Sequence, residues 1–428
     1  PRIANYDIDV RLDPEKKLIY GDEWLSWKNT SSDVIDELRF HLYLNGFRNN
    51  KSTFMLESGG RHRNYKMDDD GWGFSNINKI VLESGVDLTE QMEFIQPDDG
   101  NEFDKTVFRL PLPQPIPPGG SIKLNIDFTA KLPQPPFART GAKEEYFFAG
   151  QWFPKIGVYI DGEGNCHQFH HNSEFFADFG VYNVRITVPE DNIVGATGIE
   201  VEVKNNGDGT ATHFYHAEDV HDFAWTTSPE FVEVTGTAQD VDIRVLMQPD
   251  HVNQSERYLK AAQVGVEYFQ NLYGDYPFPN LTVVDPRRKA GGSGGMEYPT
   301  LITAGTSYGM PDGIRIPEMV IIHEFGHNYW YHLVASNEFE EAWLDEGINS
   351  YSENRIMAAE YGPEGDMFDI YGIKLNDTHL QRAMYIGRAS YNPIVRNSWD
   401  FYSNSSYAVN NYPRPSLMLL TLQNYLGQ

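Results

Sequence analysis

Two histidines and a glutamate in the segment His323-Glu324-Phe325-Gly326-His327 have the residue types and the spacing of a metal site. Residues four apart on a helix lie on one face about one turn apart, so both imidazoles can reach a single ion. This separation suits two ligands of a tetrahedral zinc ion. Glu324 cannot occupy the same position as the first ligand, and it is free to accept a proton from a metal-bound water. Alone, the pattern also fits two ordinary histidines on a surface helix.

A third ligand is needed, because catalytic zinc takes three protein ligands and keeps one position for water. Glu346 follows His327 after eighteen intervening residues, within Trp343-Leu344-Asp345-Glu346-Gly347. A helix–loop–helix hairpin would bring its carboxylate to the same ion. Most helix glutamates simply face solvent, but the combined pattern is much rarer by chance than either part.

A glycine-rich segment, Gly294-Gly295-Met296-Glu297-Tyr298, lies upstream of the histidines. Glycine lets a backbone approach a ligand closely, and an edge segment of this kind can pair with an extended peptide. Glu297 would then offer a carboxylate to the free α-ammonium group of a substrate. The alternative is a turn that carries an exposed acid.

Together these segments resemble the M1 family of zinc aminopeptidases, gluzincins that include aminopeptidase N and leukotriene A4 hydrolase. The resemblance implies one Zn²⁺ per chain, bound by His323, His327 and Glu346, with Glu324 as the general base. It also implies a substrate-binding segment that anchors the peptide N-terminus, made of Gly294, Gly295, Met296 and Glu297. The segment ends in Tyr298, where the best-known members of the family have Asn.

The same resemblance implies three further site residues. Tyr412, in Tyr412-Pro413-Arg414-Pro415, stands where the family has a tyrosine that hydrogen-bonds the oxyanion, although Arg-Pro replaces the family's Lys-Gly. Tyr407 matches a second active-site tyrosine of some relatives, and Gln151 matches a glutamine that contacts the substrate amine. A purely structural role is favoured for Tyr407 and is the alternative for Tyr412, and the segment around Gln151 departs from the family's spacing. We interpret a histidine group outside these motifs as structural rather than as a second metal site: His167, His170 and His171.

The elements that must position these residues differ between the two halves of the chain. Apolar residues alternate with polar ones in the first half, which predicts antiparallel strands, as at Tyr6, Ile8, Val10 and Leu12. From about residue 253 the period becomes helical, with helices expected over 317–334 and 341–360 and a strand over 281–285. We therefore predict a multidomain α+β fold. A β-rich saddle or sandwich domain spans residues 1–236, and a mostly helical zinc peptidase domain, thermolysin-like by the resemblance, spans residues 237–428.

Composition excludes several classes of protein. The chain has 428 residues, and 34 Lys and Arg against 61 Asp and Glu give a net charge of −27, which disfavours nucleic acid and anionic membranes as partners. A single cysteine, Cys166, excludes an intrachain disulfide framework. No apolar run is long enough to cross a membrane, and we expect the richest run, Ser416 to Leu422, to be a core helix.

The function that these features predict is hydrolysis of the N-terminal bond of peptides with a free N-terminus. The alternatives are a zinc endopeptidase, a zinc hydrolase of non-peptide substrates, and an inert binding or scaffold protein. The chain begins at Pro1 without Met and stops at Gln428, so we expect a removed leader or a longer parent sequence, with an incomplete catalytic domain. An extracytoplasmic location, secreted or periplasmic, is favoured over the cytoplasm.

Overall fold

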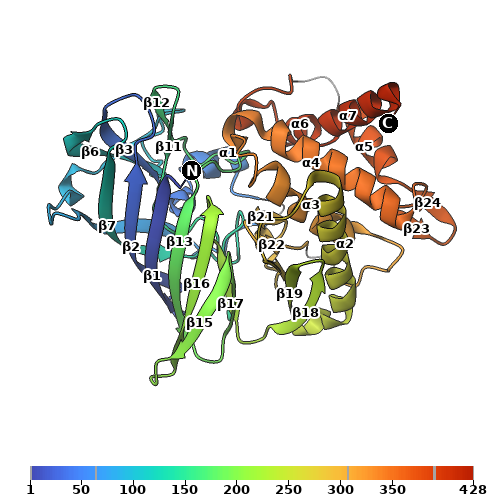
Figure 1. Ribbon diagram of the computed structural model, residues 1–428, viewed down its shortest axis with the longest axis horizontal. Coiled ribbons are helices and arrows are strands. Elements are labelled where there is room, and N and C mark those ends of the chain that lie inside the picture. Colours follow the sequence, from blue (N-terminus) through green and yellow to red (C-terminus); the bar gives the residue numbers. More distant parts are fainter. Residues whose placement is uncertain (1, 63–64, 306–307, 389–391, 428) are drawn as a thin grey trace. The chain divides into compact units, whose positions relative to one another are not determined.

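The computed structural model describes residues 2–62, 65–305, 308–388 and 392–427. They form two compact units (Figure 1). The first unit comprises residues 1–171, 177–231 and 289–293, and the second comprises residues 172–176, 232–288 and 294–428. The predicted order, β-rich and then mainly helical, is confirmed. The predicted division at residues 236 and 237 falls inside a strand of the second unit, β18 (Val232–Ala238).

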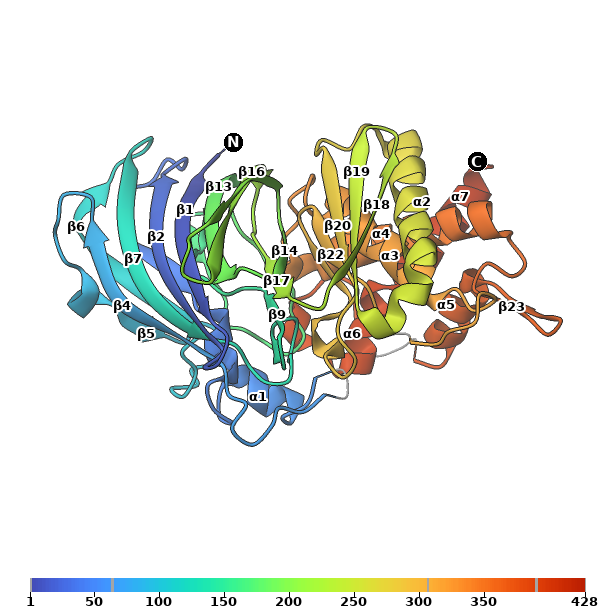
Figure 2. The ribbon, with the colours of Figure 1, turned by 90° about the horizontal axis from the view of Figure 1, so that it is seen from below.

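The first unit is built on a seven-stranded sheet whose strands follow one another across the unit in Figures 1 and 2. Their order is β15 (Ile199–Asn205), β16 (Thr210–Val220), β13 (Gly180–Pro189), β1 (Ala4–Asp13), β2 (Leu18–Lys28), β7 (Ser121–Lys131) and β4 (Phe74–Leu82). The alternation predicted for the first strand is confirmed, because Tyr6, Ile8, Val10 and Leu12 are all buried in β1.

Smaller sheets complete the first unit. One four-stranded sheet has the order β10 (Lys155–Ile156), β3 (Ile35–His41), β6 (Val107–Ile116) and β5 (Glu93–Ile95). Another has the order β14 (Ile193–Ala196), β17 (Trp225–Ser228), β9 (Tyr146–Ala149) and β8 (Gly141–Lys143). The first unit also contains the hairpin of β11 (Val158–Ile160) and β12 (Glu163–Asn165) and a short α-helix, α1 (Thr53–Ser58).

A five-stranded mixed sheet forms one part of the second unit. Its order is β18, β19 (Val241–Met247), β20 (Asn280–Val284), β22 (Leu301–Thr303) and β21 (Met296–Tyr298). β19, β20 and β22 are parallel neighbours, whereas β21 pairs antiparallel with β22. β21 is therefore an edge strand, and it carries Glu297.

Helices form the rest of the second unit: α2 (Ser255–Tyr273), α3 (Ile316–Trp330), α4 (Glu338–Tyr361), α5 (Asp377–Ile386), α6 (Asn404–Asn411) and α7 (Pro413–Leu426). A hairpin of β23 (Phe368–Ile370) and β24 (Ile373–Leu375) precedes α5. The core joins the sheet to α2 and α3 through buried side chains such as Val245, Phe269 and Phe325. Gly274 caps α2, and it lies where the sequence predicted the end of that helix.

Two sequence expectations about these helices were wrong. α3 ends at Trp330, four residues before the predicted end. The run from Ser416 to Leu422 lies in α7, but Met418 is 46% exposed and Leu422 is 50% exposed, so it is not a core helix. The apolar run itself does not tell which of its faces has a neighbour. Among the described residues, no helix has the length and apolarity that a membrane crossing requires.

Candidate metal centre

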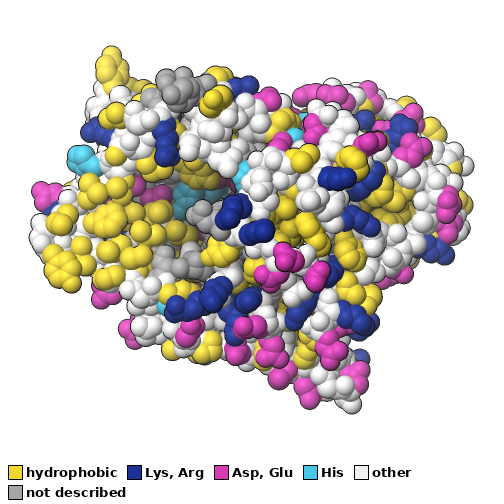
Figure 3. Space-filling view, turned by 180° about the vertical axis from the view of Figure 1, so that it is seen from behind, with side chains coloured by type: hydrophobic (Ala, Val, Ile, Leu, Met, Phe, Trp, Pro, Cys, Tyr) yellow, Lys and Arg dark blue, Asp and Glu magenta, His cyan; other side chains and the backbone are white. Residues whose placement is uncertain are grey.

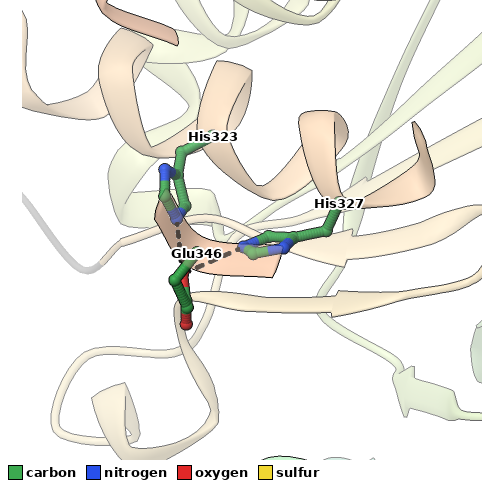
Figure 4. A group of neighbouring side chains, drawn as sticks. All are labelled: His323, His327 and Glu346. Atoms are coloured by element: carbon green, nitrogen blue, oxygen red, sulfur yellow. Dashed lines mark hydrogen bonds and ion pairs between the residues drawn. The ribbon is translucent and has the colours of Figure 1, made fainter. Parts of the chain in front are cut away.

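Helix α3 positions the two histidines. Pro317 and Glu318 stand in its first turn, where a fixed φ and an acidic side chain both favour helix formation. His323 and His327 follow on one face, and Figure 4 shows their imidazoles directed toward the same carboxylate. Both side chains are buried. The predicted pairing of the two imidazoles is therefore present in the structure.

Helix α4 supplies the third side chain, Glu346. Its Oε2 lies 3.2 Å from Nε2 of His323 and 3.4 Å from Nε2 of His327 (Figure 4). Ligand atoms about 2.0–2.2 Å from a tetrahedral zinc ion lie roughly 3.4 Å from one another. Both nitrogen–oxygen distances are close to this value, and all three ligand atoms lie within 4.8 Å of one another. Their chemical types suit one zinc ion, so they form a group that can hold a metal ion.

The outer nitrogen of each imidazole faces a second carboxylate. Nδ1 of His327 lies 2.5 Å from Oδ1 of Asp345, and Nδ1 of His323 lies 3.4 Å from Oε2 of Glu353. The amide of Asn349 also donates to the backbone carbonyl of His323, at 2.7 Å. Carboxylates at this position fix the ring orientation of a metal-bound histidine and increase its basicity. Both imidazoles are thus held so that Nε2 points at Glu346.

Charge interactions at the site are strong because all the groups are buried. Burial opposes the charge on His323, but contacts with Glu346 and Glu353 outweigh it and raise its pKa to about 10. Burial likewise acts against the charge on Glu346, yet the two histidines lower its pKa. Burial, together with the charge of Asp377, raises the pKa of Glu353 to about 8. A divalent cation would therefore replace protons on the imidazoles, since metal ligands must be deprotonated.

Glu324 and Glu297 lie beside this group. One carboxylate oxygen of each is within 4.8 Å of the other and of a ring nitrogen of His327. Both side chains are buried, and burial raises the pKa of Glu297 well above its ordinary value. The structure therefore brings the predicted general base and the predicted amine anchor to the same histidine.

The segment before Glu297 forms the expected edge. Gly294 and Gly295 precede β21, and the N–H of Gly295 donates to the carbonyl of Thr303 on β22, at 3.0 Å. Gly295 has a φ of 63°, a left-handed conformation that favours glycine. Met296 is buried in the sheet. The glycines thus turn the chain into the edge strand that carries Glu297.

The two predicted tyrosines belong to neighbouring helices. Tyr412 is the N-cap residue of α7, and its hydroxyl donates to Oε1 of Glu346. Its ring stacks on that of His323, with centroids 5.9 Å apart. Burial and the charge of Glu346 raise its pKa, so the phenol keeps its proton. Tyr407 lies on α6 in a small apolar cluster against which Tyr412 packs.

Gln151 and the other histidines belong to the first unit. The amide of Gln151 donates to Oδ2 of Asp222. His170 contacts Oε1 of Glu57 at 2.8 Å and Oδ2 of Asp98 at 3.2 Å, and Nδ1 of His167 contacts Oδ1 of Asp98 at 2.7 Å. These pairs fit the structural interpretation of the histidine group. Among the described residues, every group with metal-ligand geometry belongs to the second unit.

The sequence prediction missed three buried acids on α4: Glu338, Asp345 and Glu353. A signal was available for Glu353, because it follows Glu346 by seven residues. Seven residues make two helical turns and return to the same face, so an acid at this spacing lies on the face that carries the ligand. The same argument does not reach Glu338, since α4 is kinked at Glu341.

Residues 256–428 match the sequence model described as the Peptidase family M1 domain. These residues belong to peptidase family M1. A leucine aminopeptidase 2 from Aspergillus niger is 41% identical over 126 residues, which cover 28% of this chain and 19% of that protein. Another from Neurospora crassa is 28% identical over 203 residues, which cover 45% of this chain and 28% of that protein. The matched part is therefore less than a third of each of these two relatives.

Solved structures of M1 proteins share the fold of the whole chain. The M1 zinc metallopeptidase from Deinococcus radiodurans matches with a TM-score of 0.64 at 16% identity, covering 100% of this chain and 84% of that chain. A variant of that enzyme bound to a Tyr-Ser-Ala substrate matches with a TM-score of 0.63 at 15% identity, covering 99% of this chain and 82% of that chain. Both units of this chain thus have counterparts in a known architecture.

Proposed function

We propose that this protein is a zinc-dependent aminopeptidase, which hydrolyses the first bond of peptides with a free N-terminus. The observation that carries the proposal is the convergence of His323, His327 and Glu346 at zinc-ligand spacing beside two further carboxylates. A bound zinc ion would supply a Lewis acid that lowers the pKa of its bound water to about 7. The aminopeptidase names of the curated relatives support the same reaction class.

Separate side chains bind the substrate amine, transfer the proton and stabilise the oxyanion. Glu297 accepts hydrogen bonds from the α-ammonium group and places the first peptide bond of the substrate. Glu324 takes a proton from the attacking water and passes it to the leaving amine, which is general base and then general acid catalysis. The phenol of Tyr412 donates a hydrogen bond to the oxyanion of the tetrahedral intermediate. The edge strand β21 offers backbone groups to an extended peptide.

Replacing the general base separates catalysis from metal binding. Glu324→Gln should keep zinc and lose turnover by about 10²–10⁴-fold, because the amide cannot accept the proton. His327→Ala should lose both zinc and turnover, since it removes a ligand. Turnover of peptide amides and zinc content by metal analysis report the two properties. Full activity of Glu324→Gln would contradict the mechanism.

One substrate comparison and one chelator test distinguish the rival activities on the same site. An aminopeptidase should cleave a free-amine peptide and reject its N-acetylated twin, whereas an endopeptidase should accept both. A hydrolase of non-peptide substrates should cleave neither peptide. A chain that holds zinc but shows no chelator-sensitive hydrolysis of any substrate would indicate an inert binding or scaffold protein.

A further inference from the structure

Three buried acids of the second unit face one another: Glu297 on β21, and Glu338 and Asp345 on α4. A carboxylate oxygen of each lies within 4.8 Å of those of the other two. Glu297 is 4% exposed, and the other two side chains are completely buried. Glu338 has no role in the proposed chemistry of zinc and water, and Asp345 uses only one of its oxygens to hold His327, so the burial of both acids beside Glu297 needs a further explanation.

Each of the three carboxylates keeps an oxygen without a hydrogen-bond partner: Oε1 of Glu297, Oε1 of Glu338 and Oδ2 of Asp345. The other oxygens are in use, since Oε2 of Glu338 accepts the N–H of Phe175 and Oδ1 of Asp345 contacts His327. Within the described part of the chain, no lysine or arginine forms an ion pair with any of the three. Three buried carboxylates that are ionised beside one imidazole, that of His327, lack full charge compensation, so the arrangement is suited to a further cation.

The donor atoms indicate which cation fits. All three are carboxylate oxygens, which are the ligands of hard divalent ions such as Mn²⁺, Ca²⁺ and Mg²⁺. Oxygens bound to one calcium ion at about 2.3–2.6 Å can be at most about 5 Å apart. The observed limit of 4.8 Å satisfies this condition. Zinc is better served by the neighbouring group, which offers two imidazoles.

We propose that Glu297, Glu338 and Asp345 form a second cation site, which binds a hard divalent ion in competition with the α-ammonium group of the substrate. The competition follows because Glu297 belongs to both sets, and this part rests on the proposed function. A hard divalent ion in excess would then inhibit by occupying the amine anchor, while zinc stays on His323, His327 and Glu346. The site makes peptide cleavage sensitive to the concentration of such ions.

Binding is tested with Mn²⁺ added to the zinc-loaded full chain and followed by electron paramagnetic resonance. We expect one Mn²⁺ beyond zinc in the wild type, and an affinity at least about tenfold weaker in Glu338→Gln. Glu340→Gln, two residues further on the same helix, is the matched control and should bind as the wild type does. Glu338→Asp, which keeps a carboxylate, should fall between them and serves if Glu338→Gln does not fold. Absence of the extra Mn²⁺, or equal binding by wild type and Glu338→Gln, overturns the proposal.

Competition is tested with a free-amine peptide substrate. Mn²⁺ should raise KM without lowering kcat in the wild type and in Glu340→Gln, and this effect should vanish in Glu338→Gln. Inhibition by Mn²⁺ that lowers kcat, or that persists in Glu338→Gln, overturns the competition. Mn²⁺ binding is measured without any hydrolysis, so a failure of the second site is distinguishable from a failure of the peptidase proposal, which the N-acetylated substrate tests.

Discussion

At the residue scale, the metal centre is a set of alternating histidines and acids. His327 lies between Glu346 and Asp345, and His323 lies between Glu346 and Glu353. Each imidazole therefore has one nitrogen for the ion and one held by a carboxylate, so the rings cannot turn without losing a contact. Rigid ligands of this kind reduce the conformational cost of metal binding.

Tyr412 and Tyr407 offer a matched pair of hydroxyl deletions. Tyr412→Phe should lower kcat by about 10²–10³-fold, because it removes the donor expected at the oxyanion. Tyr407→Phe removes a hydroxyl from a neighbouring ring in the same apolar cluster, and it should lower kcat by less than about tenfold. Steady-state kinetics on one peptide amide measure both variants. Similar losses in the two would show that Tyr412 acts through packing rather than through its phenol.

At the element scale, the close crossing of α3 and α4 brings the ligands together, and Gly326 permits that crossing. A Cβ at Gly326 would lie 1.9 Å from Oδ1 of Asn349 on α4 and 2.5 Å from Cζ of Phe269 on α2. The glycine between the two histidines thus lets both neighbouring helices approach. Glycine in a helix interior lowers helix stability by about 1 kcal/mol relative to alanine. Gly326 therefore contributes to stability through the close packing that it permits.

Gly326→Ala should therefore destabilise the protein by about 1–3 kcal/mol and weaken zinc binding, because α4 carries Glu346 and must move away. The gain in helix propensity is too small to offset overlaps of this size. A competition titration against a chelator gives zinc affinity, and thermal unfolding gives stability. Gly387→Ala is the control: its Cβ would have no neighbour nearer than 3.6 Å, and its φ of −70° suits alanine. Equal zinc affinity in the two variants would contradict this role of Gly326.

The elements around the site were predictable where local pattern and burial agree. The alternation in β1 and the Gly274 cap of α2 are read directly from the sequence, because each depends on neighbours along the chain. The predicted start of the ligand helix, Glu341, is where the backbone of α4 departs from helical angles, with φ −140° and ψ 50°. An earlier turn, which contains Glu338, was missed. Asn337 caps this turn by accepting the N–H of Phe339, and Glu338 also accepts the N–H of Phe175, which is far away in the sequence.

At the scale of the whole molecule, two five-residue segments each belong to a different unit from the residues on either side of them in the sequence. Residues 172–176 belong to the second unit, and residues 289–293 belong to the first. Specific contacts explain this, since the hydroxyl of Tyr331 donates to the carbonyl of Phe175 and that of Tyr146 lies 3.0 Å from Oγ of Ser293. No periodicity encodes such exchanges, so a single boundary was the most that the sequence could give.

Net charge is also a weak guide at this scale. The chain carries a charge of −27, yet Figure 3 shows Lys and Arg side chains interspersed with Asp and Glu on one face. Partners meet a local surface rather than a total charge, and exposed charges are screened beyond about 10 Å at ordinary salt. The buried acids of the second unit are therefore a better guide to function than the net charge of the chain.

The stability of the first unit should depend on pH through His170. Burial alone would lower its pKa, but hydrogen bonds with Asp98 and Glu57 raise it to about 9 from an ordinary 6.5. Since the folded value exceeds the unfolded one, the stabilisation is complete below about pH 6.5 and is lost as the pH rises through about 9. The difference corresponds to about 3 kcal/mol of unfolding free energy.

Calorimetry of the wild type and of His170→Gln, at about pH 6 and about pH 10, measures this contribution. The wild type should unfold at a higher midpoint temperature than the variant at about pH 6. This difference in midpoint should be smaller at about pH 10, by roughly 6–12 °C. His171→Gln is a control of opposite sign, because burial lowers the pKa of His171 and the wild type should lose stability only at acidic pH. If the midpoint difference between the wild type and His170→Gln is the same at both pH values, His170 is neutral in the folded unit. Its contacts with Asp98 and Glu57 are then hydrogen bonds without an ion-pair contribution.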